Sequence, residues 1–530
     1  MRSLHRWDMQ IAPRDKSCSF AYHLCHKTQE ALNLRRRGLC CEPVPRPPHH
    51  AIGIDLDYPF ADNDPLEGLA TLAERLEMLK GSIGSDDPDA IPHGDRPAVT
   101  SREKRPPNYI QLLPKHLQTH ALLIGATGCG KTNLIHHLIE QDLDLNQSFC
   151  ILDLRGNLVK DALVLCARKQ VDPRRVRILD LRERERPLGF DPLFGAGPAY
   201  FRALNVLDAV EDASESWGVQ IPETFRNVLI PLAEAKQPMT QLDKFFFDAD
   251  FRRACLSESE EEPVVSFWKR FDELTKERQA GLAMPVLNKV SILFATKTLR
   301  RILGSDRPFD LSRHLDTKGS ITLVSLAYDE MHSAGQILGK MFLSSLCREV
   351  FARIGIPEKR RNGVRLYVDE FEHFGTKDFE NILAEGRKFR LRVVLAHQTL
   401  AQLTPAMRSI ILGNVGAKVV FRTGFEDGVR LSKDLTGGAD TYNFQGFRRG
   451  EAVLWRKPGF LRRFMVCPPL IENSGEMTDE AKEYVERVYD TFADEPERQS
   501  HVSTPVELPP ESSQRKRKQS TGSLEDWLCE

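Results

Sequence analysis

The chain has 530 residues, of which 41% are hydrophobic and 28% are charged, and its formal net charge at pH 7 is −1. This length allows roughly two to four domains with a large buried core. The near-zero net charge excludes bulk electrostatic attraction to nucleic acid, although basic groups can still gather along one channel of such a protein. The sequence has no apolar run long enough to span a membrane and no secretory signal, so we expect a cytoplasmic protein without a direct membrane span.

Cysteine usage agrees with a reducing compartment. The eleven cysteines are scattered singly, apart from Cys40 and Cys41, which favours free thiols over a disulfide framework. The cysteines and histidines among the first fifty residues do not have the spacing of a regular zinc knuckle, so no zinc site is predicted there.

The first part of the chain, residues 1–105, is predicted to be a poorly ordered extension. Prolines and acidic clusters interrupt any regular pattern along it. One amphipathic stretch, residues 66–79, predicts a short helix within this extension.

A complete phosphate-binding loop follows the apolar run 121–124 and precedes residues 133–139, which have helical spacing. Its eight residues are Gly125, Ala126, Thr127, Gly128, Cys129, Gly130, Lys131 and Thr132. The glycines let the backbone N–H groups point at phosphate oxygens, and the next helix adds its positive end. Strand, loop and helix are the context that a P-loop requires, so we expect the chain to bind a nucleoside triphosphate.

Apolar runs alternate with helical segments from about residue 106 onward. Eight of these runs are typical of strands: 121–124, 149–154, 176–179, 321–326, 364–368, 393–396, 419–421 and 452–455. Several are continuous rather than alternating, as expected for parallel strands that are buried on both faces. The pattern predicts an α/β core with a parallel-rich sheet, formed by residues 106–195 and 291–472.

Two regions differ from this rhythm. Residues 196–290 have helical periods and few strand signals, which predicts an inserted all-α subdomain. Residues 473–530 are predicted to form a largely disordered tail after one acidic helix at 478–485. The terminal pair Trp527-Leu528 is interpreted either as a docking motif for a partner or as a frayed helix end.

A second half of the nucleotide site appears far downstream of the P-loop. The apolar strand 364–368 ends in Asp369 and Glu370, which is the Walker B arrangement. In that arrangement Asp369 binds Mg²⁺ together with Thr132 of the P-loop, and Glu370 polarises the attacking water. The pair of motifs predicts ATP and Mg²⁺ as the ligands.

Polar groups at the ends of two other strands are further candidates. Gln398 follows the strand 393–396, where its amide can contact both a γ-phosphate and a water, and a strand cap is the alternative interpretation. Asp153 ends another strand, and we retain both a role near the site and a role in turn capping.

Arg387 is the candidate for neutralising charge on a γ-phosphate, placed there by a neighbouring subunit. Four cationic side chains lie within six residues here, and from spacing alone a solvated face or a nucleic-acid contact remains an alternative. In a protein that binds nucleic acid, Lys388, Arg390 and Arg392, or Arg448 and Arg449, could contact phosphates, although a solvated surface is the favoured interpretation of any one of them.

The order of these motifs resembles the HerA/FtsK superfamily, and within it the TraG/TraD-type coupling ATPases of conjugation and type IV secretion. The motifs that carry the resemblance are the P-loop, Leu152-Asp153-Leu154-Arg155-Gly156, Val368-Asp369-Glu370, Gly386-Arg387-Lys388, Leu395-Ala396-His397-Gln398-Thr399 and the segment 411–422. The resemblance spans about residues 115–470, including an insertion placed like the family's all-α domain.

The resemblance implies a RecA-like P-loop NTPase core in an ATP-hydrolysing DNA translocase that works as a homohexameric ring. It assigns Lys131 and Thr132 to ATP and Mg²⁺, Asp369 to the metal and Glu370 to the catalytic base. It further assigns Arg387 to a trans arginine finger, Gln398 to a γ-phosphate sensor and Arg422 to a weaker second trans contact.

Two departures from the family pattern are visible. Membrane-anchored members begin with transmembrane helices that this sequence lacks, so a soluble form is expected, recruited to the inner membrane by partners. The usual Asp-Pro-Lys-Gly is replaced by Asp153-Leu154-Arg155-Gly156, which keeps the positive charge.

The implied partners are single- or double-stranded DNA, further copies of the chain, and relaxosome or secretion-channel proteins. Two alternatives stay open: a HerA-like repair motor that works with a nuclease, and a nucleotide-dependent scaffold that recruits protein substrates.

Overall fold

The computed structural model describes residues 54–55, 119–214, 217–259, 261–374, 377–438, 442–457 and 459–494. The helix expected at 66–79 and most of the N-terminal extension lie outside these residues, as does the tail beyond residue 494 with its terminal Trp527-Leu528. Among the described residues, no helix combines the length and the apolar character that a membrane crossing requires.

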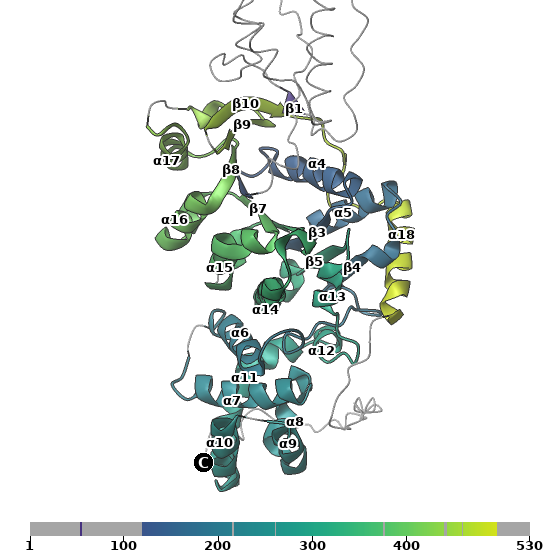
Figure 1. Cartoon of the computed structure of the whole chain (residues 1–530), viewed down its shortest axis with the longest axis vertical. Helices are drawn as coiled ribbons and strands as arrows, with labels where there is room; N and C mark the ends of the chain where they lie inside the picture. Colours follow the sequence, from purple (N-terminus) through teal and green to yellow (C-terminus); the bar gives the residue numbers. More distant parts are fainter. Residues whose placement is uncertain are drawn as a thin grey trace, which may run out of the picture. The chain divides into compact units, whose positions relative to one another are not determined.

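In the described part of the chain, one sheet has ten strands in the order β1-β10-β9-β8-β2-β7-β6-β3-β5-β4 (Figure 1). Their bounds are β1 Ile54–Asp55, β2 His120–Ile124, β3 Ser148–Asp153, β4 Val176–Asp180, β5 Ile321–Ser325, β6 Val364–Val368, β7 Leu391–His397, β8 Val415–Val420, β9 Glu451–Arg456 and β10 Phe460–Val466. Neighbours from β8 to β4 pair in parallel, whereas β9 and β10 are antiparallel. The predicted α/β class with a parallel-rich sheet is confirmed.

The central strands are buried on both faces, as their continuous apolar runs predict. Leu122 and Ile124 of β2 belong to one hydrophobic core, and Ala121 and Leu123 belong to the core on the other face. Strand β10 was not predicted, because its sequence carries Arg462 and Arg463 and five of its seven positions are only partly buried.

Helices cover both faces of the sheet (Figure 1). One face packs against α4 (Lys131–Asp144), α5 (Asn157–Arg168) and α18 (Asp479–Asp490). The other face packs against α14 (Tyr328–Phe351), α15 (Lys377–Glu385), α16 (Pro405–Asn414) and α17 (Phe425–Thr436). Sheet and helices together form the layered arrangement that a mostly parallel sheet requires.

A run of helices connects β4 to β5. They are α6 Ala199–Glu211, α7 Ile221–Glu234, α8 Leu242–Phe247, α9 Ala249–Leu256, α10 Glu262–Asp272, α11 Lys276–Val290, α12 Lys297–Leu303 and α13 Leu311–Asp316. Trp268 is fully buried against the rings of Phe245, Phe246 and Phe271, and its indole N–H donates to the carbonyl of Asn227 at 2.8 Å. The helices continue to residue 316, beyond the predicted insertion of 196–290, whose bounds stay a prediction.

The acidic helix expected at 478–485 is α18, which continues to Asp490. Its buried side chains Tyr484 and Val488 lie in the same hydrophobic core as α5. The segment before α18 is joined to α5 because Ser474 and the backbone N–H of Gly475 both donate to the carboxylate of Asp161.

Candidate functional site

The loop between β2 and α4 has the backbone that its glycines were expected to allow. Gly128 and Gly130 adopt φ angles of +73° and +114°, a region that side-chain-bearing residues rarely occupy. Gly130 also contacts its surroundings closely, since a Cβ there would lie 3.2 Å from the Cα of Gly450. The N–H of Gly450 donates to the carbonyl of Cys129 at 2.8 Å, so the segment before β9 supports the loop from outside.

The ends of the two strands beside β2 hold the start of the same loop. The N–H of Gly125 donates to the carbonyl of His397 at 3.2 Å, and the N–H of Ala126 donates to the carbonyl of Arg422 at 2.8 Å. A side chain at Gly125 would collide with Phe421, whose Cβ would be 2.7 Å away. The loop is therefore anchored to β7 and β8 as well as to its own strand.

Lys131 and Thr132 open helix α4 directly behind the loop. The Nζ of Lys131 donates to the carbonyls of Gly125 at 2.6 Å and Ala126 at 3.1 Å. The ammonium therefore lies inside the curl of the loop, where it can exchange these carbonyls for phosphate oxygens.

Carboxylates gather beside this ammonium at the ends of β3 and β6. Burial, together with the nearby Asp153 and Glu370, raises the pKa of Asp369 to about 7, and Lys131 acts in the opposite direction. A cation placed next to Asp369 would relieve this concentration of negative charge. The described residues contain no cluster of three or more metal-ligating side chains.

Glu370 lies between two partners from other strands. One carboxylate oxygen is 3.4 Å from Nε2 of Gln398, and the other is 3.4 Å from Nε of Arg155. Its backbone has a φ of +52°, the left-handed region that strains a non-glycine residue and often occurs at functional sites. Its side chain is only 18% exposed, so the carboxylate is held in place but can still reach solvent.

Gln398 connects the two halves of the site. Its amide oxygen accepts a hydrogen bond from Thr127 Oγ1 of the P-loop at 3.1 Å, while its amide nitrogen contacts Glu370. Gln398 therefore touches both the phosphate-binding loop and the carboxylate that follows β6.

Asp153 is a turn cap. Its carboxylate accepts the backbone N–H of Arg155 at 3.0 Å and the backbone N–H of Val159 at 3.1 Å, and burial raises its pKa. Arg155, which the sequence presented only as a change in the family motif, contacts Glu370, as Gln398 also does. No local pattern could have found this contact, because the two residues are 215 positions apart.

Arg387 lies at the amino ends of the parallel strands, whereas the P-loop of the same chain follows the carboxyl end of β2. It precedes β7 in the one-turn helix η8 (Gly386–Phe389), is exposed, and lies near His120, the first residue of β2. Burial and the charge of Arg387 lower the pKa of His120 to about 4. The P-loop follows the other end of β2, so the length of this strand separates Arg387 from the P-loop of its own chain.

Arg422, expected to contact a second subunit, lies beside the P-loop of its own chain. Its carbonyl accepts the N–H of Ala126, and its charge acts on Cys129 within the loop. The backbone of Arg422 therefore serves as a support for the loop in cis.

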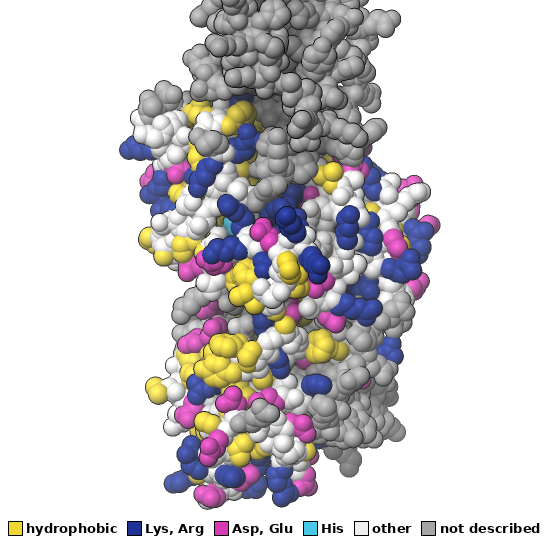
Figure 2. All heavy atoms as spheres, in the orientation of Figure 1, with side chains coloured by type: hydrophobic (Ala, Val, Ile, Leu, Met, Phe, Trp, Pro, Cys, Tyr) yellow, Lys and Arg dark blue, Asp and Glu magenta, His cyan; other side chains and the backbone are white. Residues whose placement is uncertain are grey.

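The basic residues proposed as DNA contacts are not equivalent. Lys388 pairs with Glu385, and Arg392 is partly buried near Arg365, where burial lowers its pKa. Arg448 and Arg449 are exposed. Figure 2 shows Lys and Arg side chains interspersed with Asp and Glu over the visible face rather than one uniform basic surface.

Comparison with known protein families gives two matches. Residues 108–163 match the DNA-binding domain of the type IV secretion-system coupling protein, and residues 363–443 match the TraM recognition site of TraD and TraG. The resemblance to coupling proteins is therefore confirmed. No curated protein sequence matches the chain.

Solved structures with a similar fold include those of coupling proteins. The bacterial conjugative coupling protein TrwBdeltaN70 is 15% identical with a TM-score of 0.50, over 69% of this chain and 89% of that chain. Plasmid coupling protein TrwB in complex with ADP and Mg²⁺ is 16% identical with a TM-score of 0.49, over 69% and 89%. VirB4 of Thermoanaerobacter pseudethanolicus is 12% identical with a TM-score of 0.42, over 66% and 90%. At 15% identity, the likeness to TrwBdeltaN70 shows a similar fold and nothing beyond the fold.

Proposed function

We propose that this chain, which carries domains of the type IV secretion coupling proteins, is an ATPase that moves DNA as a ring of identical subunits. The observation that carries the proposal is the convergence of Lys131, Asp369, Glu370 and Gln398 at the carboxyl ends of three neighbouring strands, β2, β7 and β6. Ligands bind at this edge in open α/β sheets.

Each side chain has a distinct part in the proposed hydrolysis of ATP. The loop N–H groups and Lys131 bind the phosphates, and Thr132 and Asp369 would hold Mg²⁺, which neutralises charge on the β- and γ-phosphates when bound. Glu370 accepts a proton from the attacking water. Gln398 orients that water and contacts the γ-phosphate, because it already bridges Thr127 and Glu370.

The position of Arg387 supports hydrolysis between subunits. The length of the parallel strands separates its guanidinium from the P-loop of its own chain. Arg387 therefore serves as a trans finger only if the nucleotide site of another copy packs against the amino ends of these strands. A ring in which each subunit presents its finger to the next meets this requirement. Closure of such a ring creates the channel through which DNA moves.

DNA is the proposed cargo because residues 108–163 match a coupling-protein DNA-binding domain. Contacts from exposed Lys and Arg to phosphates would hold either single- or double-stranded DNA without reading its sequence. Relaxosome or secretion-channel proteins are the proposed further partners, and they would recruit the chain to the inner membrane.

Steady-state ATP hydrolysis with and without DNA tests the proposal. We expect both single- and double-stranded DNA to stimulate hydrolysis, and stimulation to fall as salt rises, because phosphate contacts release counterions. Lys131→Ala should abolish nucleotide binding. An ATP hydrolysis rate that DNA does not change at low salt would contradict the motor function.

A recruiting scaffold is the second candidate function, since residues 363–443 match a recognition site for a partner protein. A scaffold predicts weak hydrolysis that DNA does not change. The same assay therefore separates the two functions.

A further inference from the structure

The turn η8, which carries Arg387, is held through contacts to its backbone and not through the side chain of Arg387. Arg387 is exposed in η8, and within the described residues its guanidinium makes no hydrogen bond or ion pair. A group that acts on another molecule must nevertheless present itself at a defined position. The contacts of the η8 backbone therefore decide where this guanidinium lies.

Arg361, in the loop between α14 and β6, makes the central contact to this turn. Its guanidinium donates to the carbonyl of Lys388 at 2.6 Å, to that of Ile356 at 2.7 Å and to that of Ile354 at 3.4 Å. The guanidinium carbon also lies 4.9 Å from the ring centre of Phe389. One side chain thus joins its own loop to two residues of η8.

The same two segments are joined a second time. The carbonyl of Arg361 accepts from Nη1 of Arg390 at 2.9 Å, and the N–H of Val364 donates to the carbonyl of Arg390 at 3.0 Å. Arg390 has a φ of +61°, which reverses the chain between η8 and β7. The side chain of Arg361 thus binds the backbone of η8, and the side chain of Arg390 binds the backbone of Arg361.

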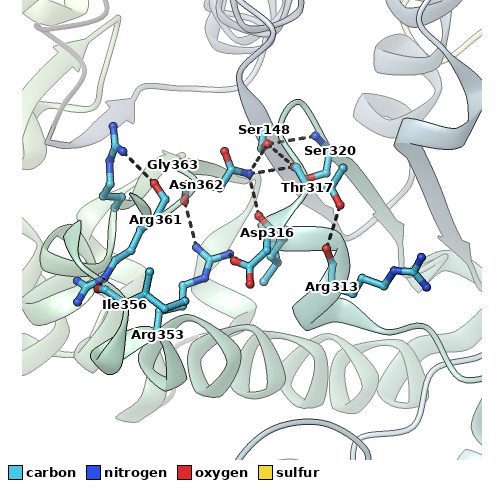
Figure 3. Close-up of polar contacts among 12 residues, drawn as sticks. Ser148, Arg313, Asp316, Thr317, Ser320, Arg353, Ile356, Arg361, Asn362 and Gly363 are labelled. Atoms are coloured by element: carbon cyan, nitrogen blue, oxygen red, sulfur yellow. Dashed lines mark hydrogen bonds and ion pairs between the residues drawn. The ribbon is translucent and has the colours of Figure 1, made fainter. Parts of the chain in front are cut away.

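The loop itself rests on the sheet through Asn362 (Figure 3). The amide of Asn362 donates to Ser148 Oγ at 2.8 Å, to the carbonyl of Leu315 at 2.8 Å and to that of Thr317 at 3.0 Å. Arg353 donates to the carbonyl of Asn362 at 3.1 Å and pairs with Asp316 at 2.8 Å. Since Ser148 begins β3, the position of Arg361 is fixed relative to the sheet.

We propose that Arg361 is a positioning residue for Arg387, which it holds ready to contact the γ-phosphate of a nucleotide bound by a second copy of this chain. Arginine suits the role because its planar group presents several donors at once, whereas lysine offers one charged point. This inference rests on the proposed function, since it requires hydrolysis between subunits.

A double-mutant cycle tests the proposal on the full chain with ATP and DNA. Arg361→Gln should lower kcat by about 10²-fold, the effect expected of a misplaced catalytic group, while KM for ATP stays unchanged. The double variant Arg361→Gln/Arg387→Ala should hydrolyse ATP no more slowly than Arg387→Ala alone, because Arg361 acts only through Arg387. Arg360→Ala is the matched control, since Arg360 is exposed in the same loop, and it should keep the parental kcat.

Three results would overturn the inference. If the losses of Arg361→Gln and Arg387→Ala multiply in the double variant, Arg361 acts through general stability and not through Arg387. If Arg387→Ala is inactive but Arg361→Gln keeps the parental kcat, the role of Arg387 as a trans finger is supported and its positioning by Arg361 is contradicted. If Arg387→Ala itself keeps full activity, the trans finger of the proposed function fails as well.

A second substitution covers the case in which Arg361→Gln does not fold. Arg361→Lys keeps the charge but can replace only part of the three carbonyl contacts, so we expect a kcat between those of the parent and of Arg387→Ala. A parental kcat for Arg361→Lys would contradict the need for a guanidinium.

Discussion

At the scale of single residues, Gln398 joins the two motifs of the nucleotide site. It accepts from Thr127 of the P-loop and lies 3.4 Å from the carboxylate of Glu370. Arg155 lies on the other side of that carboxylate, but it is 64% exposed, so its ion pair contributes little to stability. The carboxylate therefore has one partner that also contacts the P-loop and one that water can readily replace.

Replacing Gln398 should separate hydrolysis from binding. We expect Gln398→Ala to lower kcat by about 10²- to 10³-fold, as loss of one charge-stabilising donor does, while the affinity for ATP stays close to that of the parent. Gln402→Ala is the matched control, because Gln402 is exposed four residues later. Single-turnover hydrolysis and binding of a fluorescent ATP analogue would measure the two effects, and an equal loss in both would contradict a sensor role.

At the scale of elements, helix α13 is tied to the start of β5 by a buried histidine. His314 Nε2 lies 3.2 Å from the carbonyl of Ile321, and the ring packs against Phe309. Burial, with a smaller contribution from Arg177, lowers the pKa of His314 to about 4. The neutral ring therefore donates to the carbonyl, and protonation would place a charge in the core.

This histidine predicts a loss of stability in acid. Between pH 6.5 and about 4 the unfolded chain binds a proton at His314 that the folded chain does not, so the free energy of unfolding falls as pH decreases. At pH 5 the contribution of His314 to this loss is about 2 kcal/mol relative to neutral pH.

Chemical denaturation at pH 7.5 and pH 5 would measure this contribution. His314→Gln keeps an amide donor for Ile321 but cannot titrate, so its stability should fall less between the two pH values. An identical fall in the parent and the variant would show that other groups account for it.

At the scale of the whole molecule, the parallel sheet separates two kinds of functional group. The P-loop, Asp369, Glu370 and Gln398 follow the carboxyl ends of their strands, whereas Arg387 precedes β7 at the amino end. Hydrolysis with a trans finger then requires a heterologous contact between subunits. In such a contact, the amino ends of the strands in one subunit face the carboxyl ends of the strands in the next.

Mixing two inactive variants tests this arrangement. Arg387→Ala retains the base and Glu370→Gln retains the finger, so each should be about 10³-fold slower than the parent when assembled alone. In an equal mixture, about a quarter of the contacts between subunits pair an intact base with an intact finger, and the rate should recover to about that fraction if sites act independently. No recovery in assemblies shown to be mixed would place Arg387 outside the catalytic contact.

Local patterns in the sequence were sufficient for the strands β2 to β9 and for the two motifs of the nucleotide site, but not for β10. Continuous apolar runs predicted β2, β3, β6 and β7, because parallel strands buried on both faces are composed mostly of apolar residues. The glycine spacing predicted the positive φ angles of the P-loop for an equally local reason.

The contacts between motifs were decided by the tertiary structure alone. Thr127 and Gln398 are 271 residues apart, and Arg155 and Glu370 are 215 apart, so each pair depends on the strand order β2-β7-β6-β3. The parallel direction of β2 and β7 places Arg387 at the amino ends of the strands, and the pairing of β6 with β7 brings Arg361 to its turn. Strand order follows from the packing of the whole core, because each strand is compatible with several neighbours and only the complete sheet buries all of them.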